Sequence, residues 1–144
     1  MRYWDTSTLA KLYVAEPDSG LFLTHLAAGI PAVTAELSRW ELFRVLARKE
    51  AEGIIGAGQA ETVFSRFQAD VAAGRITLLP FGQAAEIRFQ ELVLRLHRQQ
   101  PAMVARTLDC IHLATADLAG VDEVVVMDAG FRKAALAIGL KVFP

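Results

Sequence analysis

Four acidic side chains are the best candidates for chemistry in this chain: Asp5, Glu41, Asp109 and Asp128. They lie far apart in sequence, yet each has apolar neighbours that disfavour an ordinary polar surface. Burying several carboxylates near one another is costly unless a cation neutralises them, so the set predicts a divalent-metal site. Oxygen ligands suit Mg²⁺ or Mn²⁺, and the natural chemistry of such a site without Cys or His ligands is phosphodiester hydrolysis.

The remaining composition narrows the class of protein. Cys110 is the only cysteine, and the three histidines do not have the spacing of a zinc motif. The formal net charge is −1, whereas proteins that hold nucleic acid by charge alone are usually basic. Any contact with nucleic acid must therefore be local or helped by a metal ion.

The chain has the length of one domain, and we treat residues 1–144 as a single domain. Hydrophobic residues make up 53%, which is apolar for a domain of this size and favours a homodimer or a partner groove. No apolar run reaches the ~18 residues of a membrane span. The N-terminus also lacks the apolar stretch of a secretory signal, so we expect a cytoplasmic protein.

Short apolar strands alternate with helices along the sequence. The expected strands are 2–5, 31–34, 76–79, 123–127 and 141–143, and the expected helices are 7–13 (capped by Thr6 or Ser7), 19–28, 37–52, 59–73, 82–99, 107–118 and 131–138. This alternation predicts an α/β fold, a three-layer α/β/α sandwich with a mostly parallel central sheet. Ligands of such sheets bind beyond the carboxyl ends of the strands.

Asp5 and Asp128 each follow an expected strand and precede a helix, which places them at the ligand edge. Each also has a simpler interpretation, because Asp5 could be a helix N-cap and Asp128 a turn residue. Thr6 and Ser7 could hydrogen-bond a metal-bound water from a second shell, although capping explains them equally well.

Glu41 and Asp109 lie in the first turns of expected helices, where backbone N–H groups favour negative charge. The simpler interpretation of Glu41 is a surface glutamate paired with Arg44 or Arg48. For Asp109 it is an N-terminal cap or a salt bridge with Arg106.

The order of these motifs resembles the PIN-domain ribonucleases, in particular the VapC toxins of toxin–antitoxin pairs. The resemblance rests on residues 3–13 (YWDTSTLAKLY), 38–44 (SRWELFR), 106–116 (RTLDCIHLATA) and 125–128 (VVMD). It spans almost the whole chain, and the first and third stretches are the most specific.

The resemblance implies that Asp5, Glu41, Asp109 and Asp128 hold Mg²⁺ or Mn²⁺ and cleave RNA. The chemistry would be in-line attack on a phosphate by a water whose pKa the metal lowers. A Ser or Thr often stands two residues before the last Asp in the family, whereas this chain has Val126, so Ser7 could supply a nearby hydroxyl.

The resemblance further implies a homodimer and an antitoxin that inserts a basic side chain among the carboxylates. The apolar residues of 12–14, with Leu42, Phe43 and Leu46, could form a groove for a partner helix, or could equally be core. Arg44, Arg106 and Arg132 are candidate phosphate contacts, with surface solvation as the alternative.

Other classes of protein remain open or fit poorly. A phosphotransfer receiver needs an acceptor Asp on its middle strand, but the strand 76–79, taken as the middle one, is followed by Pro80. A haloacid-dehalogenase-type phosphatase needs an Asp where Ser7 stands. A non-catalytic PIN-like domain that binds RNA or a partner remains an alternative, as does a housekeeping PIN nuclease without an antitoxin.

Overall fold

All residues from 1 to 144 are described in the computed structural model of the chain, and five short strands form its centre. They are β1 (Arg2–Trp4), β2 (Ala32–Ala35), β3 (Ile76–Leu79), β4 (Glu123–Val125) and β5 (Lys141–Phe143). Every neighbouring pair is parallel, and the strand order is β3-β2-β1-β4-β5. The predicted parallel sheet is therefore confirmed.

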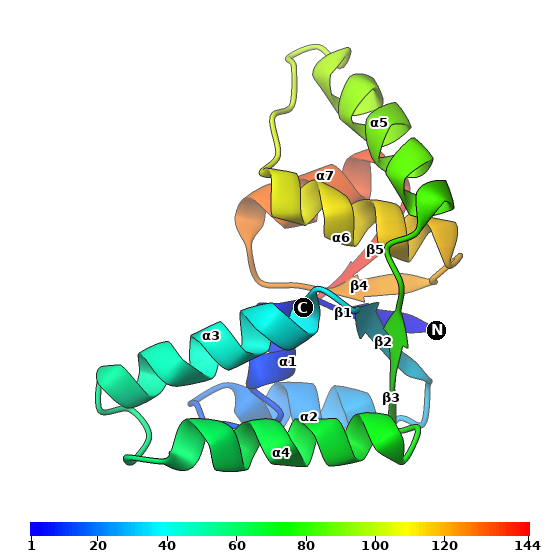
Figure 1. The fold of residues 1–144 in the computed structure, drawn as a ribbon. Helices are drawn as coiled ribbons and strands as arrows, with labels where there is room; N and C mark the ends of the chain where they lie inside the picture. Colours follow the sequence, from blue (N-terminus) through cyan, green and yellow to red (C-terminus); the bar gives the residue numbers. More distant parts are fainter.

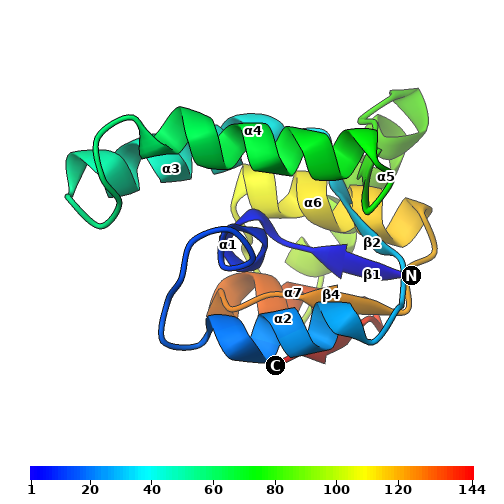
Figure 2. The same cartoon turned by 90° about the horizontal axis from the view of Figure 1, so that it is seen from below.

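Seven helices cover the two faces of this sheet (Figure 1). They are α1 (Thr6–Ala10), α2 (Ser19–Ala27), α3 (Ser38–Ala51), α4 (Gln59–Ala72), α5 (Gln83–His97), α6 (Thr107–Leu118) and α7 (Ala129–Ala137). α5, α6 and α7 lie on one face and α1 to α4 on the other (Figure 1), and the view from below looks onto α2 and α4 (Figure 2). The three-layer α/β/α sandwich is thus as predicted.

The strands build two separate cores because successive side chains point to opposite faces of a sheet. Tyr3 and Val124 join the core beneath α5, α6 and α7, whereas their neighbours Trp4 and Val125 join the core beneath the other helices. All four are essentially inaccessible to solvent. The short strands therefore read as apolar runs because both faces are buried.

The direction in which successive strands are added to the sheet reverses at β1. From β1 the chain moves outward through β2 to β3, while β4 and β5 lie on the other side of β1. The connections after β1 and β4 leave toward opposite faces, and this creates a crevice at their carboxyl ends. Asp5 directly follows β1 and Asp128 lies just beyond β4, so the sequence placed both at the correct edge.

Several expectations about the elements were wrong. The first helix ends at Ala10, because Lys11, Leu12 and Tyr13 hydrogen-bond to the third residue before them, in the tighter 3₁₀ pattern. Its N-cap is Asp5 rather than Thr6 or Ser7. The strand Ile76–Leu79 is an edge strand and not the middle one, since β1 occupies the centre.

No helix combines the length and the apolar character needed to cross a lipid bilayer.

Candidate active site

A hollow of about 330 Å³ opens at the carboxyl end of β1 and receives side chains from three parts of the chain. The loop after β1 and the start of α1 contribute Asp5, Thr6 and Ser7; α3 contributes Glu41, Arg44 and Val45; and the start of α6 contributes Arg106, Thr107, Leu108, Asp109 and His112. Three of the four predicted carboxylates therefore line one pocket, although more than a hundred residues separate the first from the last.

Asp5 is both a helix N-cap and a buried carboxylate that could bind a cation. Its Oδ2 accepts hydrogen bonds from the Ser7 backbone N–H at 3.1 Å and from the Ser7 hydroxyl at 2.5 Å, which caps α1. Burial nevertheless raises the pKa of Asp5 above its ordinary value, although the hydrogen bonds from Ser7 oppose this. A carboxylate in this environment gains from a nearby cation.

Glu41 does not pair with Arg44 or Arg48. Its Oε2 instead accepts hydrogen bonds from the Thr6 hydroxyl at 2.5 Å and from His112 Nε2 at 2.7 Å. Burial tends to raise the pKa of Glu41, but the bonds from His112 and Thr6 outweigh this and hold the pKa below its ordinary value. Glu41 therefore carries its negative charge inside the pocket.

Asp109 is the most buried of the four carboxylates, and Arg106 holds it as the sequence suggested. Arg106 Nε donates to Asp109 Oδ2 at 2.9 Å, and Nη2 donates to Asp128 Oδ2 at 3.0 Å. Asp128 also caps α7 by accepting from the Phe131 N–H at 2.8 Å. Asp128 is thus joined to the pocket through Arg106 and does not itself line it.

The arginines expected to contact phosphate occupy different surroundings. Arg44 is exposed and lines the pocket, while Arg106 lines it but is paired with two carboxylates. Arg132 donates to the Val126 carbonyl at 3.1 Å and lies outside the pocket. Of the three, Arg44 is the one placed to meet a ligand in the pocket without breaking an ion pair.

The carboxylates do not converge on a single point as the side chains stand. No three of the chain's His, Cys, Asp and Glu side chains lie close enough together to ligate one ion. The Arg106 guanidinium lies between Asp109 and Asp128, where it supplies the positive charge that a cation would supply. The donors are nevertheless all carboxylate oxygens, which is the chemistry that Mg²⁺ and Mn²⁺ prefer.

The sequence reasoning did not select His112, which lines the same pocket. Its side chain is buried, and both ring nitrogens have partners: Nδ1 meets the Tyr3 hydroxyl at 2.5 Å and Nε2 meets Glu41. The sequence does indicate that His112 lies near the pocket, because His112 follows Asp109 by three residues and therefore shares its face of α6.

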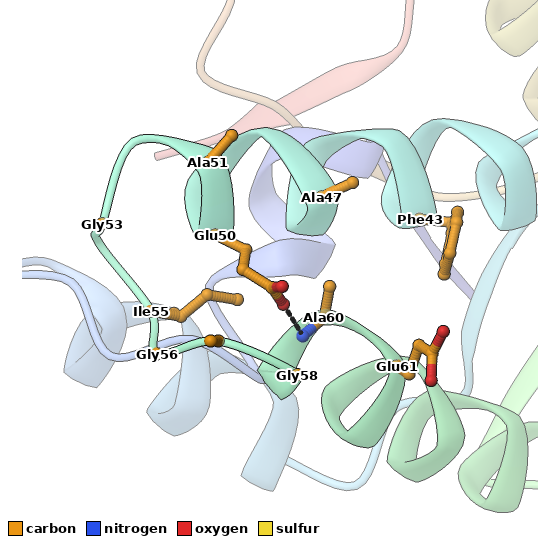
Figure 3. Close-up of a pocket in the computed structure, with 11 residues that line it drawn as sticks. Phe43, Ala47, Glu50, Ala51, Gly53, Ile55, Gly56, Gly58, Ala60 and Glu61 are labelled. Atoms are coloured by element: carbon orange, nitrogen blue, oxygen red, sulfur yellow. Dashed lines mark hydrogen bonds between the residues drawn. The ribbon is translucent and has the colours of Figure 1, made fainter.

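A larger hollow of about 670 Å³ lies between the end of α3 and the start of α4 (Figure 3). Its lining is mostly apolar or glycine, and its charged residues are Glu50 and Glu61. Glu50 accepts a hydrogen bond from the Ala60 N–H at 2.7 Å, which caps α4 where Gly58 offers no side chain. This hollow lacks convergent reactive groups, so the smaller acidic pocket is the candidate active site.

The fold and the pocket together define an α/β/α domain with clustered carboxylates at the switch point of a parallel sheet. The family model of the PIN domain matches residues 2–136. The chain therefore belongs to the PIN-domain family.

Two ribonucleases are similar to this chain over most of its length. Ribonuclease VapC46 of Mycobacterium tuberculosis strain H37Rv is 33% identical over 142 residues, covering 97% of this chain and 94% of the relative. Ribonuclease VapC47 of Mycobacterium tuberculosis strain CDC 1551 is 34% identical over 120 residues, covering 81% of this chain and 74% of the relative.

Solved structures share the fold at lower sequence identity. A FitAB complex bound to an IR36 DNA fragment superposes with a TM-score of 0.74 at 18% identity, covering 99% of this chain and 94% of that one. The toxin VapC20 of Mycobacterium tuberculosis, described as cleaving the sarcin–ricin loop, has a TM-score of 0.69 at 16% identity, covering 93% and 95%. These likenesses confirm the predicted PIN-like fold.

Proposed function

We propose that the chain is a metal-dependent endoribonuclease and the toxin of a type II toxin–antitoxin pair. The observation that carries this proposal is the meeting of Asp5, Glu41 and Asp109 in one pocket of a PIN-domain chain. Identity of 33% to a VapC ribonuclease over almost the whole chain supports the same reaction. A PIN-like domain that only binds RNA would not need this carboxylate set.

The residues of the pocket can perform distinct parts of phosphodiester hydrolysis. Asp5, Glu41 and Asp109, with Asp128 beside them, concentrate negative charge where Mg²⁺ or Mn²⁺ would be held. The ion, when bound, would lower the pKa of an attacking water and offset charge on the phosphate. Arg44 at the exposed rim can contact a phosphate oxygen and align the strand.

The hydroxyls of Thr6 and Ser7 support the carboxylates directly. Thr6 donates to Glu41, and Ser7 donates to Asp5. Both bonds leave the second carboxylate oxygen, Oε1 of Glu41 and Oδ1 of Asp5, free for another partner. Support of this kind holds metal-binding carboxylates in a fixed orientation.

The partners of this activity would be an RNA substrate and an antitoxin protein. Arg106 between Asp109 and Asp128 illustrates that these carboxylates accept a guanidinium, so an antitoxin Arg or Lys can occupy the pocket in the same way. Leu42 and Leu46, expected in a groove or in the core, are core. Phe43, a member of the same expected set, is exposed, and together with the exposed Trp40 of α3 it offers an apolar surface for a partner chain.

Further apolar side chains are exposed elsewhere on the surface and support a homodimer. Light scattering of the purified protein would detect it. RNA as substrate also fits a cytoplasmic protein.

RNA cleavage by the purified protein is the direct test of the proposed activity. End-labelled cellular RNA should be cut with Mg²⁺ or Mn²⁺ and left intact with EDTA. Asp109→Asn should remove those cuts, because the most buried of the four carboxylates loses its charge. The cut positions, read on a sequencing gel, would also identify the RNA target.

Asp122→Asn is the matched control for this substitution. Asp122 is exposed and pairs only with the N-terminal amine, so its loss should leave every cut in place. Intact RNA under all metal conditions, from folded protein free of antitoxin, would contradict the ribonuclease proposal and favour a binding domain.

Arg106 should compete with a metal ion for Asp109 and Asp128. Arg106→Gln is therefore expected to tighten Mn²⁺ binding by up to about fivefold, since the Arg106 side chain is mostly exposed and a solvent-screened ion pair contributes ~1 kcal/mol at most. Loss of the free Mn²⁺ signal in electron paramagnetic resonance measures this affinity. Arg95→Gln, an exposed change on α5, is the control, and weaker binding by Arg106→Gln would contradict the competition.

A further inference from the structure

His112 links the buried centre of the domain to the acidic pocket. It lies on α6, is 1% exposed, and contacts Tyr3 of β1 through Nδ1 and Glu41 of α3 through Nε2. Its ring also packs beside Phe131 of α7, with the ring centres 6.1 Å apart. Four elements therefore fix the position of this imidazole.

The tautomer of His112 follows from the bonds of Tyr3. The Tyr3 hydroxyl oxygen accepts a hydrogen bond from the Ala35 N–H at 3.0 Å, so its own proton is directed elsewhere. A tyrosine hydroxyl keeps its proton near neutral pH and must donate it. The remaining partner is His112 Nδ1 at 2.5 Å, which must accept the proton.

A neutral imidazole that accepts at Nδ1 carries its hydrogen on Nε2. This N–H then points to Glu41 Oε2 at 2.7 Å, where it serves as donor to a carboxylate. The Thr6 hydroxyl donates to the same oxygen at 2.5 Å. Both donors thus hold Oε2, and Oε1 is the Glu41 oxygen without a hydrogen-bond partner in the chain.

We propose that His112 is a positioning residue, which Tyr3 holds in the Nε2–H tautomer and which orients Glu41 for the cation and substrate in the pocket. A free glutamate side chain samples many rotamers, and ordering it only on ligand binding costs conformational entropy. The buried Tyr3–His112–Glu41 chain orders the carboxylate beforehand. This inference rests on the proposed function, since it assigns His112 a part in the same site.

The direct test is the tautomer of His112 in the metal-free protein. Long-range ¹H–¹⁵N correlation spectra distinguish a ring nitrogen that carries hydrogen from one that does not, and the spectrum of His112→Gln assigns the signal among three histidines. We expect hydrogen on Nε2 alone near neutral pH. In Tyr3→Phe, which removes the donor to Nδ1 and also the acceptor of the Ala35 N–H, we expect a mixture of tautomers. A dominant Nδ1–H form in the native protein would overturn the proposal.

Direct Mn²⁺ binding gives the second readout. His112→Leu removes the donor to Glu41 and is expected to weaken binding ~10- to 100-fold, the usual loss when a partner of a metal ligand is removed. Gln can donate through its amide nitrogen and accept through its oxygen, so His112→Gln should recover most of this affinity. His97→Gln, an exposed change on α5, should have no effect.

The two readouts separate this inference from the proposed ribonuclease activity. Native Mn²⁺ affinity in folded His112→Leu, or no recovery by His112→Gln, would refute the positioning role even if RNA is cleaved. The expected tautomer and affinities without any RNA cleavage would support the positioning role and refute the nuclease. Thermal unfolding of each variant, measured beforehand, confirms that binding is compared between folded proteins.

Discussion

Asp5→Asn is expected to lower RNA cleavage on the order of 10³-fold and to raise the melting temperature of the metal-free protein. The loss of cleavage follows because one metal ligand contributes several kcal/mol to the stabilisation of the negative charge in the transition state. The gain in stability follows because burial raises the pKa of Asp5, so its ionised form is disfavoured in the folded state. Asn retains an oxygen that can cap α1.

The stability gain should depend on pH in a defined direction. Below the ordinary pKa of an aspartate, Asp5 is protonated in both the folded and the unfolded protein, so Asn brings no advantage. As the pH rises, the unfolded state ionises first because the pKa of folded Asp5 is raised. The native protein then loses stability relative to Asp5→Asn until folded Asp5 has ionised as well, and above that pH the difference stays constant.

Thermal unfolding in EDTA from pH 3 to pH 8 measures this difference, which should reach a few degrees at the upper end. Added Mn²⁺ should raise the melting temperature of the native protein more than that of Asp5→Asn. Asp122→Asn is a control for which the change in melting temperature should have the opposite sign, because the hydrogen bond with the N-terminal amine lowers the pKa of Asp122. An unchanged melting temperature of metal-free Asp5→Asn at pH 7, together with RNA cleavage at the native rate, would show that Asp5 is only a cap.

The position of Asp5 and Asp128 could be predicted from sequence because it depends on local patterns. An apolar strand followed by an acidic residue and a helix places that residue at the carboxyl edge of a parallel sheet. Both positions were correct for this reason. The same pattern could not give the strand order, which depends on contacts between distant segments, and Ile76–Leu79 was wrongly taken as the middle strand.

The partners of Glu41 could not be predicted from its own helix. Arg44 and Arg48 are close in sequence, but both are exposed, whereas Glu41 faces the pocket and meets His112 across 71 residues. His112 escaped attention because its apolar neighbours are typical of a helix that is mostly core. Its role depends on Tyr3, and only the folded sheet brings that residue to it.

Asp128 combines a cap and a charge, and two substitutions should separate them. Asp128→Asn is expected to reduce RNA cleavage on the order of 100-fold, because a carboxylate beside the ion is lost. Stability should change little, since the Asn oxygen can still accept from the Phe131 N–H. Asp128→Ala should lose cleavage to the same extent and also ~1 kcal/mol of unfolding free energy, because the cap of α7 disappears.

Urea unfolding of both variants, together with cleavage measured under single-turnover conditions, distinguishes the two roles. Cleavage by Asp128→Asn at the native rate would mean that Asp128 serves α7 alone and that Asp5, Glu41 and Asp109 suffice. Equal loss of cleavage in the two variants, with only Asp128→Ala destabilised, would instead show that its charge acts at the site independently of the cap.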